Sequence, residues 1–188
     1  YLKMKLIFLF LFFIFLSLSS ISAIQAIKFF SKNAFSPTLA KKFWSFCISS
    51  YCSPARIEKW DVGVVKQQYP DITEITVAED HSKNTLGYTA YNSKDDEILL
   101  VFRGTQPTSL KNWISNVDFI KIYHPGCKGC EVHRGFYNSY MSLKQNMLDS
   151  LSKLLKKHRK AKRCVMGHSL GGAMALLAAI DIIRLYGK

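Results

Sequence analysis

The sequence lacks internal repeats, low-complexity tracts and a flexible linker between domains. These absences exclude solenoids and multidomain arrays, because solenoids need a recurring sequence unit and multidomain chains need polar linkers between domains. A chain of 188 residues without these features is consistent with one domain that is large enough to bury a hydrophobic core. The sequence also has no Asn-x-Ser/Thr sequon, so it offers no acceptor for N-linked glycosylation.

Acidic residues are scarce, since 13 Asp and Glu stand against 26 Lys and Arg, for a net charge of +13. The basic residues are densest from Lys153 to Arg163, "KLLKKHRKAKR", where leucines at helical spacing leave most charges on the opposite face. Two interpretations stay open: attraction to an anionic lipid surface, or the more common solvated helix face. Nucleic acid is not expected as a partner, because no recognition module accompanies the charge.

A long apolar run occurs only near the start of the chain. Residues 6–16, "LIFLFLFFIFL", follow Lys3 and Lys5 and precede the small residues "SLSSISA". This order is typical of a secretory signal peptide, and the run is short for a membrane span. We therefore expect residues 1–23 to be a signal peptide and residues 24–188 to form one domain of a secreted protein. An uncleaved membrane anchor is the alternative.

Cysteine is too sparse to complete a zinc site. Cys127 and Cys130 form one CxxC motif, but no second motif and no paired histidines supply the remaining ligands. In the oxidising environment of a secreted protein, we expect two local disulfides, Cys47–Cys52 and Cys127–Cys130. Redox chemistry or half a metal site is the alternative for the CxxC pair. Cys164 remains as a buried thiol on a strand.

The middle and end of the chain alternate between strand and helix patterns. A nearly continuous apolar strand, "ILLVF", indicates a sheet that is covered on both faces. A strand–helix–strand–helix order predicts an α/β fold with a right-handed crossover. We expect strands over 75–77, 86–91, 98–102, 117–123 and 164–166, and helices that start near Gly135 and span 172–186. Ile27 to Trp60 is expected to be helical and loop-like, broken at Pro37 and Pro54.

One motif predicts a catalytic residue. Gly167-His168-Ser169-Leu170-Gly171 matches G-x-S-x-G, between a short apolar strand and a helix of small residues. A serine at such a turn is pushed clear of the sheet, and the flanking glycines let strand and helix come close. We expect Ser169 to be a nucleophile, with the backbone N–H of Leu170 facing a developing oxyanion. His168 is adjacent to it, so its side chain diverges and a structural role is expected.

"GHSLGG", together with "VFRGT", "NWISN" and "HRGF" in this order, resembles the class 3 lipases of filamentous fungi. The resemblance implies an α/β-hydrolase fold. It also implies that Thr105 and Leu170 form the oxyanion hole, that Arg103 anchors its turn, and that His133 is structural. The two cysteine pairs are similar to small disulfides of some fungal members.

The same resemblance implies a lid over residues 110–117. Leu110, Trp113, Ile114 and Val117 recur there at near-helical spacing. An apolar face of this kind covers the site in water and turns onto lipid at an interface. The tryptophan suits a lipid–water boundary, because its ring is apolar and its N–H is polar.

No histidine follows Ser169 in the sequence. In α/β-hydrolase order, the acid and the base of a triad both come after the serine. Asp181 lies in the helix behind the turn and is not expected to be the triad acid. We therefore expect the N-terminal portion of a lipase domain, an incomplete α/β-hydrolase fold whose C-terminal strands with the catalytic Asp and His are missing. This polypeptide alone is expected to have little or no activity.

These observations predict a secreted carboxylic ester hydrolase of lipid metabolism, similar to the triacylglycerol lipases and acting through an acyl-enzyme. Its expected partner is a lipid ester at a lipid–water interface, and the complete protein is expected to be a monomer. No metal or organic cofactor is required by this chemistry. The alternatives are a phospholipase A1 or another esterase of the same family, and a non-catalytic protein that binds lipid surfaces.

Overall fold

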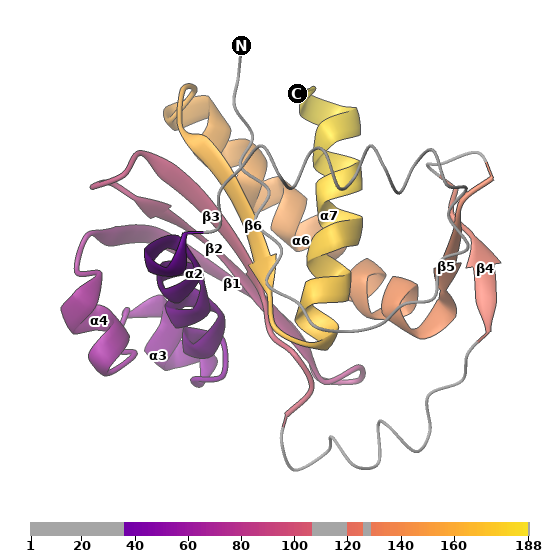
Figure 1. Cartoon of the computed structure of the whole chain (residues 1–188), viewed down its shortest axis with the longest axis horizontal. Helices are drawn as coiled ribbons and strands as arrows, with labels where there is room; N and C mark the ends of the chain where they lie inside the picture. Colours follow the sequence, from indigo (N-terminus) through magenta and orange to yellow (C-terminus); the bar gives the residue numbers. More distant parts are fainter. Residues whose placement is uncertain (1–35, 107–119, 126–128, 188) are drawn as a thin grey trace.

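The computed structural model describes residues 36–106, 120–125 and 129–187. The strands of the main sheet are β1 (Ile72–Asp80), β2 (Thr85–Asn92), β3 (Glu97–Phe102) and β6 (Lys162–Gly167). They lie in the order β1-β2-β3-β6 (Figure 1). The first three strands are antiparallel to one another, whereas β3 and β6 run parallel. The carboxyl ends of β3 and β6 therefore meet at one edge of the sheet.

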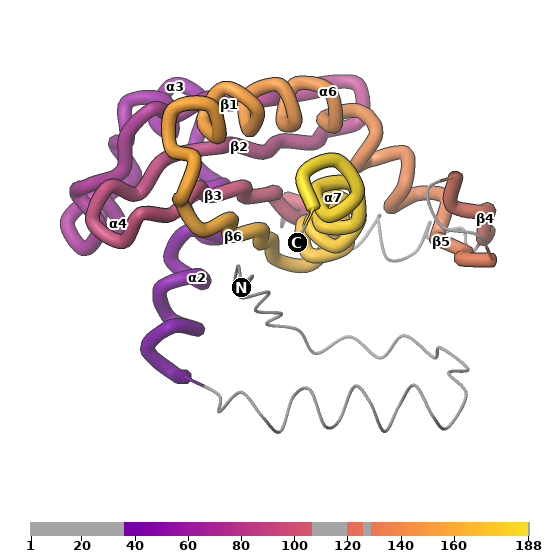
Figure 2. The backbone as a smooth tube through the Cα atoms, turned by 90° about the horizontal axis from the view of Figure 1, so that it is seen from above, coloured from indigo at the N-terminus to yellow at the C-terminus, as the bar shows by residue number. Residues whose placement is uncertain are grey.

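Helices cover both faces of the sheet (Figure 2). They are α2 (Pro37–Ser49), α3 (Pro54–Glu58), α4 (Val64–Gln68), α6 (Arg134–Lys157) and α7 (Leu170–Tyr186). α6 and α7 share one core with Ile98, Leu100 and Phe102 of β3. The alternate residues Leu99 and Val101 belong to a second core, on the side of α2 and α3. β3 is buried on both faces, as its continuous apolar run predicts.

Two prolines begin helices instead of breaking them. Pro37 and Pro54 occupy the first turns of α2 and α3. Proline is favoured there, because its ring presets the helical φ and its missing N–H would have had no intrahelical partner. Ser36 caps α2 and accepts a 3.3 Å hydrogen bond from the Leu39 N–H. The expected breaks at these prolines are therefore helix starts.

The other predicted elements are present, with longer bounds. The strand expected over 75–77 extends over the whole of β1, and the strand expected over 164–166 is β6. The hairpin of β2 and β3 and the two long helices lie where the sequence places them. Part of the strand expected over 117–123 appears as β4 (Lys121–Tyr123), which pairs with β5 (Glu131–His133).

Several sequence-based expectations fall outside the described residues. These are the signal peptide over residues 1–23, the lid over residues 110–117 with Leu110, Trp113, Ile114 and Val117, and Cys127. Of the helices in the part of the chain that the structure describes, none combines the length and apolarity that crossing a membrane requires.

Candidate functional site

The turn between β6 and α7 holds Ser169 in a strained backbone conformation. Its φ is 55° and its ψ is −125°, a region that residues with a side chain rarely adopt. Such strain costs on the order of 1–3 kcal/mol and persists only where the surroundings enforce it. Here they do, because Gly171 and Gly172 donate backbone hydrogen bonds of 2.9 and 2.8 Å to the carbonyls of His168 and Ser169.

Close backbone packing explains the two motif glycines. A Cβ on Gly167 would overlap the backbone of Gly171, and a Cβ on Gly171 would overlap the Phe102 carbonyl at the end of β3. The helix can therefore start directly against the two strands. Ser169 is half-buried at the N-terminus of α7, and its side chain does not cap the helix. Because Gly171 and Gly172 use their N–H groups within the turn, the N–H of Leu170 is the one at the start of this helix that the turn does not use.

The segment after β3 lies beside this turn. Phe102 pairs with Gly167 in the sheet, so both chains leave the ladder at the same level. A Cβ built on Gly104 would lie 3.2 Å from the Ser169 Cβ. Thr105 follows directly, and its buried Oγ1 has no hydrogen-bond partner among the described residues. Buried hydroxyls are normally bonded, so a missing partner makes this position unusual.

Arg103 anchors the same segment, as the family resemblance implies. Its Nη2 donates to Asn84 twice, to the carbonyl at 3.1 Å and to Oδ1 at 2.9 Å. Its backbone N–H donates to the Leu86 carbonyl at 2.8 Å. Burial lowers the pKa of the guanidinium, while Glu79 and Tyr51 act in the opposite direction. The loop is thus tied to β2 just before it reaches Ser169.

His168 is held by residues near the C-terminal end of α2. Its Nδ1 lies 2.9 Å from the Tyr51 hydroxyl, and its ring meets the Trp44 ring edge-on at a centroid distance of 5.3 Å. This packing agrees with the expected structural role. The sequence alone does not identify Tyr51 and Trp44 as neighbours of the site. No local motif marks them, since they contact a residue more than a hundred positions away.

Two further polar residues have structural partners. His133 caps α6 by accepting a hydrogen bond of 3.3 Å at Nδ1 from the Phe136 N–H. Asp181, buried in α7, accepts from the Tyr140 hydroxyl at 2.9 Å and lies 2.7 Å from the Lys144 ammonium. Burial alone would raise the pKa of Asp181, but the bonds from Lys144 and Tyr140 bring it below its usual value. This carboxylate joins α6 to α7.

The expected Cys47–Cys52 disulfide is wrong, because both residues are free thiols. Cys47 points into the core of α2 and the sheet, whereas Cys52 is half-buried in the turn beyond the helix. Burial raises the pKa of the Cys47 thiol to about 12. Cys164 is a buried free thiol, as expected. The Cys127–Cys130 bridge stays a prediction, since Cys127 lies outside the described residues.

A cation site is not evident in the parts of the chain that the structure describes. There, no three or more His, Cys, Asp or Glu side chains gather in a way that could hold a metal ion. The polar groups at the β6–α7 turn and in the loop beside it are instead the hydroxyls of Ser169 and Thr105 and the backbone N–H of Leu170. Such a set matches the needs of an acyl group whose carbonyl oxygen becomes negative.

Known proteins are similar to this chain in sequence. The family model of class 3 lipases matches residues 99–187. The lipase of Rhizopus niveus is 34% identical over 144 residues, which are 76% of this chain and 36% of that protein. The lipase of Rhizomucor miehei is 35% identical over 101 residues, 54% of this chain and 27% of that protein. The chain thus spans about a third of the length of these curated relatives.

Solved structures agree with the sequence comparison. The Rhizomucor miehei triacylglyceride lipase matches with a TM-score of 0.72 and 29% identity, over 82% of this chain and 58% of that one. Lipase II from Rhizopus niveus matches with a TM-score of 0.71 and 30% identity, over 89% of this chain and 58% of that one. The described part therefore has the α/β-hydrolase fold, and the chain belongs to the class 3 lipase family.

Proposed function

We propose that the chain carries the nucleophile and oxyanion hole of a carboxylic ester hydrolase that acts on acylglycerols. The observation that carries this proposal is the strained backbone of Ser169, with φ at 55°, at the start of a helix and against Gly104. Backbone strain of this kind is retained where function requires it. The buried Oγ1 of Thr105 in the neighbouring loop, which has no partner in the described part of the chain, supports the same site.

In this mechanism, the Ser169 hydroxyl attacks the ester carbonyl while a base accepts its proton. The carbonyl oxygen becomes an oxyanion that accepts hydrogen bonds from Thr105 and from the Leu170 N–H. Collapse of the tetrahedral species expels the alcohol and leaves an acyl-serine, which water then hydrolyses to the fatty acid. Loss of one such donor typically raises the barrier by roughly 3–4 kcal/mol. No step requires a metal or an organic cofactor.

In α/β-hydrolases, the acid and the base of the triad follow the nucleophile in sequence. No histidine follows Ser169, and Asp181 is already paired with Lys144. Without a base, a serine hydrolase keeps only the contribution of the oxyanion hole and of binding, roughly 10³–10⁴ over water. We therefore propose that the 188-residue polypeptide alone hydrolyses esters very slowly.

The proposed substrate class rests on relatives. The secreted mono- and diacylglycerol lipase A of Penicillium cyclopium is 32% identical over 117 residues. By analogy, we propose that residues 1–23 direct secretion, that residues 24–188 belong to one hydrolase domain, and that the protein acts as a monomer on lipid esters at an interface. Leu110, Trp113, Ile114 and Val117 would form the apolar face of its lid. A phospholipase A1 or another esterase is the alternative within the same chemistry.

An alkylboronic acid tests the nucleophile without needing the base. Boron binds a serine oxygen and becomes tetrahedral, so that one of its own oxygens occupies the oxyanion position. We expect the full chain to bind butylboronic acid as a tetrahedral adduct, detected by boron NMR. Ser169→Ala should weaken binding by at least ~10-fold, whereas the exposed Ser53→Ala should not.

Two outcomes would contradict the proposal. One is the absence of a tetrahedral adduct on the wild-type chain, and the other is an adduct that survives in Ser169→Ala. A chain that forms no adduct but binds acylglycerol vesicles would instead support the non-catalytic lipid-binding alternative.

A further inference from the structure

The Tyr51 hydroxyl lies between the two segments that form the proposed oxyanion hole. It is 2.9 Å from Nδ1 of His168, the residue before Ser169. It also faces Gly104, the residue before Thr105, so closely that a Cβ on Gly104 would overlap both this hydroxyl and the His168 carbonyl. One oxygen atom thus touches both sides of the site, one residue away from each functional group.

The chemistry of the bridge follows from its partners. A phenol hydroxyl can accept one hydrogen bond and donate another. The Gly104 backbone N–H bonds to the Tyr51 oxygen, which leaves the phenol proton for the unprotonated Nδ1 of His168. Burial raises the pKa of Tyr51, so the phenol keeps this proton at neutral pH. The bridge requires the tautomer of His168 that carries its proton on Nε2.

The bridge stands on a rigid support. Tyr51 follows the end of α2, and its backbone N–H donates to the Ile48 carbonyl at 3.1 Å. Phe46 of α2 is fully buried in the core that it shares with Val101 of β3. Trp44, two helical turns before Tyr51, packs against the His168 ring. The position of the phenol is therefore set by the sheet and not by the site itself.

We propose that Tyr51 is a positioning residue that sets the distance between the Thr105 loop and the Ser169 turn. The sheet cannot do this alone, because the register of β3 and β6 ends at Phe102 and Gly167. Oxyanion donors act only within a few tenths of an ångström of their ideal position, so an unbridged loop would lose alignment. This inference rests on the proposed function of Ser169 and extends it to a residue that never touches substrate.

Tyr51→Phe tests the bridge, with Tyr88→Phe as its matched control. Both changes remove one hydrogen-bonded hydroxyl near α2, but only that of Tyr51, which is half-buried, reaches the site. We expect Tyr51→Phe to weaken butylboronic acid binding by about tenfold or more, and Tyr88→Phe to change it by less than about twofold at a similar loss of Tm. Equal effects of the two variants, or unchanged binding in Tyr51→Phe, would overturn the proposal.

A second readout separates this inference from the proposed function. Nitrogen NMR of the His168 ring should report the Nε2–H tautomer in wild type and a mixture in Tyr51→Phe, and the Gly104 amide should exchange faster in that variant. Unchanged values of both would overturn the bridge even where boronic acid binds. A wild-type chain that forms no adduct contradicts the role of Ser169, and the Gly104 and His168 signals still decide whether the bridge exists.

Discussion

At the scale of single residues, the site depends on three glycines that have no Cβ. Gly167, Gly171 and Gly104 each leave a space that a neighbouring backbone or hydroxyl fills. The close approach of two strands, one helix and one loop follows from these three positions. Ser169 carries the strain of the turn, and the backbone bonds of the next helical turn hold it there.

Adding one methyl group at Gly104 should damage the site. Gly104→Ala places a Cβ on the Tyr51 hydroxyl and the His168 carbonyl, and such overpacking costs roughly 1–3 kcal/mol. We expect weaker butylboronic acid binding and a lower free energy of unfolding in urea. Gly172→Ala is the control, because its methyl meets only the Gly167 carbonyl at 3.3 Å, within a helix that favours alanine. Equal binding in the two variants would show that the space at Gly104 is not needed.

Thiol reactivity should follow burial. Burial raises the pKa of both the Cys47 and Cys164 thiols to about 12, so almost no thiolate forms at pH 8. Cys52 is half-buried and should be the first of the three to react with iodoacetamide in the folded chain. Peptide mapping by mass spectrometry checks this order. A Cys47–Cys52 disulfide in the unreduced protein would refute the free-thiol arrangement.

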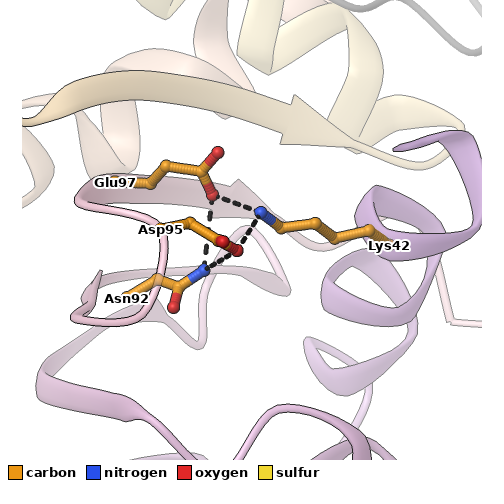
Figure 3. A network of polar contacts seen from close by, with 4 residues as sticks. All are labelled: Lys42, Asn92, Asp95 and Glu97. Atoms are coloured by element: carbon orange, nitrogen blue, oxygen red, sulfur yellow. Dashed lines mark hydrogen bonds and ion pairs between the residues drawn. The ribbon is translucent and has the colours of Figure 1, made fainter. Parts of the chain in front are cut away.

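At the scale of elements, ion pairs reinforce the attachment of α2 to the sheet, with which it also shares an apolar core. Lys42 of α2 reaches the β2–β3 hairpin, where its ammonium lies 2.6 Å from Asp95 and 2.6 Å from Glu97 (Figure 3). Asn92 donates to the same two carboxylates. Burial alone would lower the pKa of Lys42, but these hydrogen bonds raise it. The network holds α2, and with it the Tyr51 bridge, against the sheet.

Removing the Lys42 charge should loosen this attachment. Lys42→Met leaves the buried Glu97 carboxylate with Asn92 as its remaining partner, and breaking a buried pair costs about 3–5 kcal/mol. Because Lys42 is partly exposed, we expect the lower end of that range in urea unfolding. Lys41→Met is the control, since Lys41 is exposed on the same helix. Two variants of equal stability would show that the network contributes little.

At the scale of the whole molecule, charge and chemistry lie at opposite ends. The basic cluster, Lys153 to Arg163, spans the end of α6 and the start of β6, whereas Ser169 follows the end of β6. A strand of six residues separates them by roughly 20 Å. This placement favours a solvated surface over a lipid-docking surface for the cluster, because a membrane at Ser169 would not meet it. Part of its charge is also neutralised, since the Glu74 carboxylate lies 2.9 Å from the Lys157 ammonium.

The stability of the whole domain should fall in acid through Asp181. Its folded-state pKa lies below the unfolded value, so its contribution is present above that value and is lost as pH falls through the folded pKa, below about pH 4. Asp181→Asn should therefore be less stable than wild type at pH 7, with the difference shrinking below pH 4. Thermal unfolding across pH 2.5–7 measures this, with the exposed Asp149→Asn as control. A difference that does not change with pH would contradict the linkage.

Much of this fold follows from local sequence. The apolar run of β3, the turn before it and the small-residue start of α7 each predict their element, because a strand or helix period depends on neighbouring residues. The motif around Ser169 likewise marks a strand-to-helix turn through its own five residues and their immediate neighbours. The spacing of Cys47 and Cys52 did not predict their state, since spacing does not say which side chain points into the core.

Tertiary structure alone decided how the site is held together. Tyr51 meets His168 across 117 positions, and Lys42 meets Asp95 across 53. No periodicity or motif encodes such contacts, because they depend on where the sheet places α2. The sequence by itself determined the local turn that presents Ser169 and the loop that presents Thr105. The distance between these two segments depends on the assembled sheet and on the helix packed against it, because the sheet brings residues that are far apart in sequence into contact.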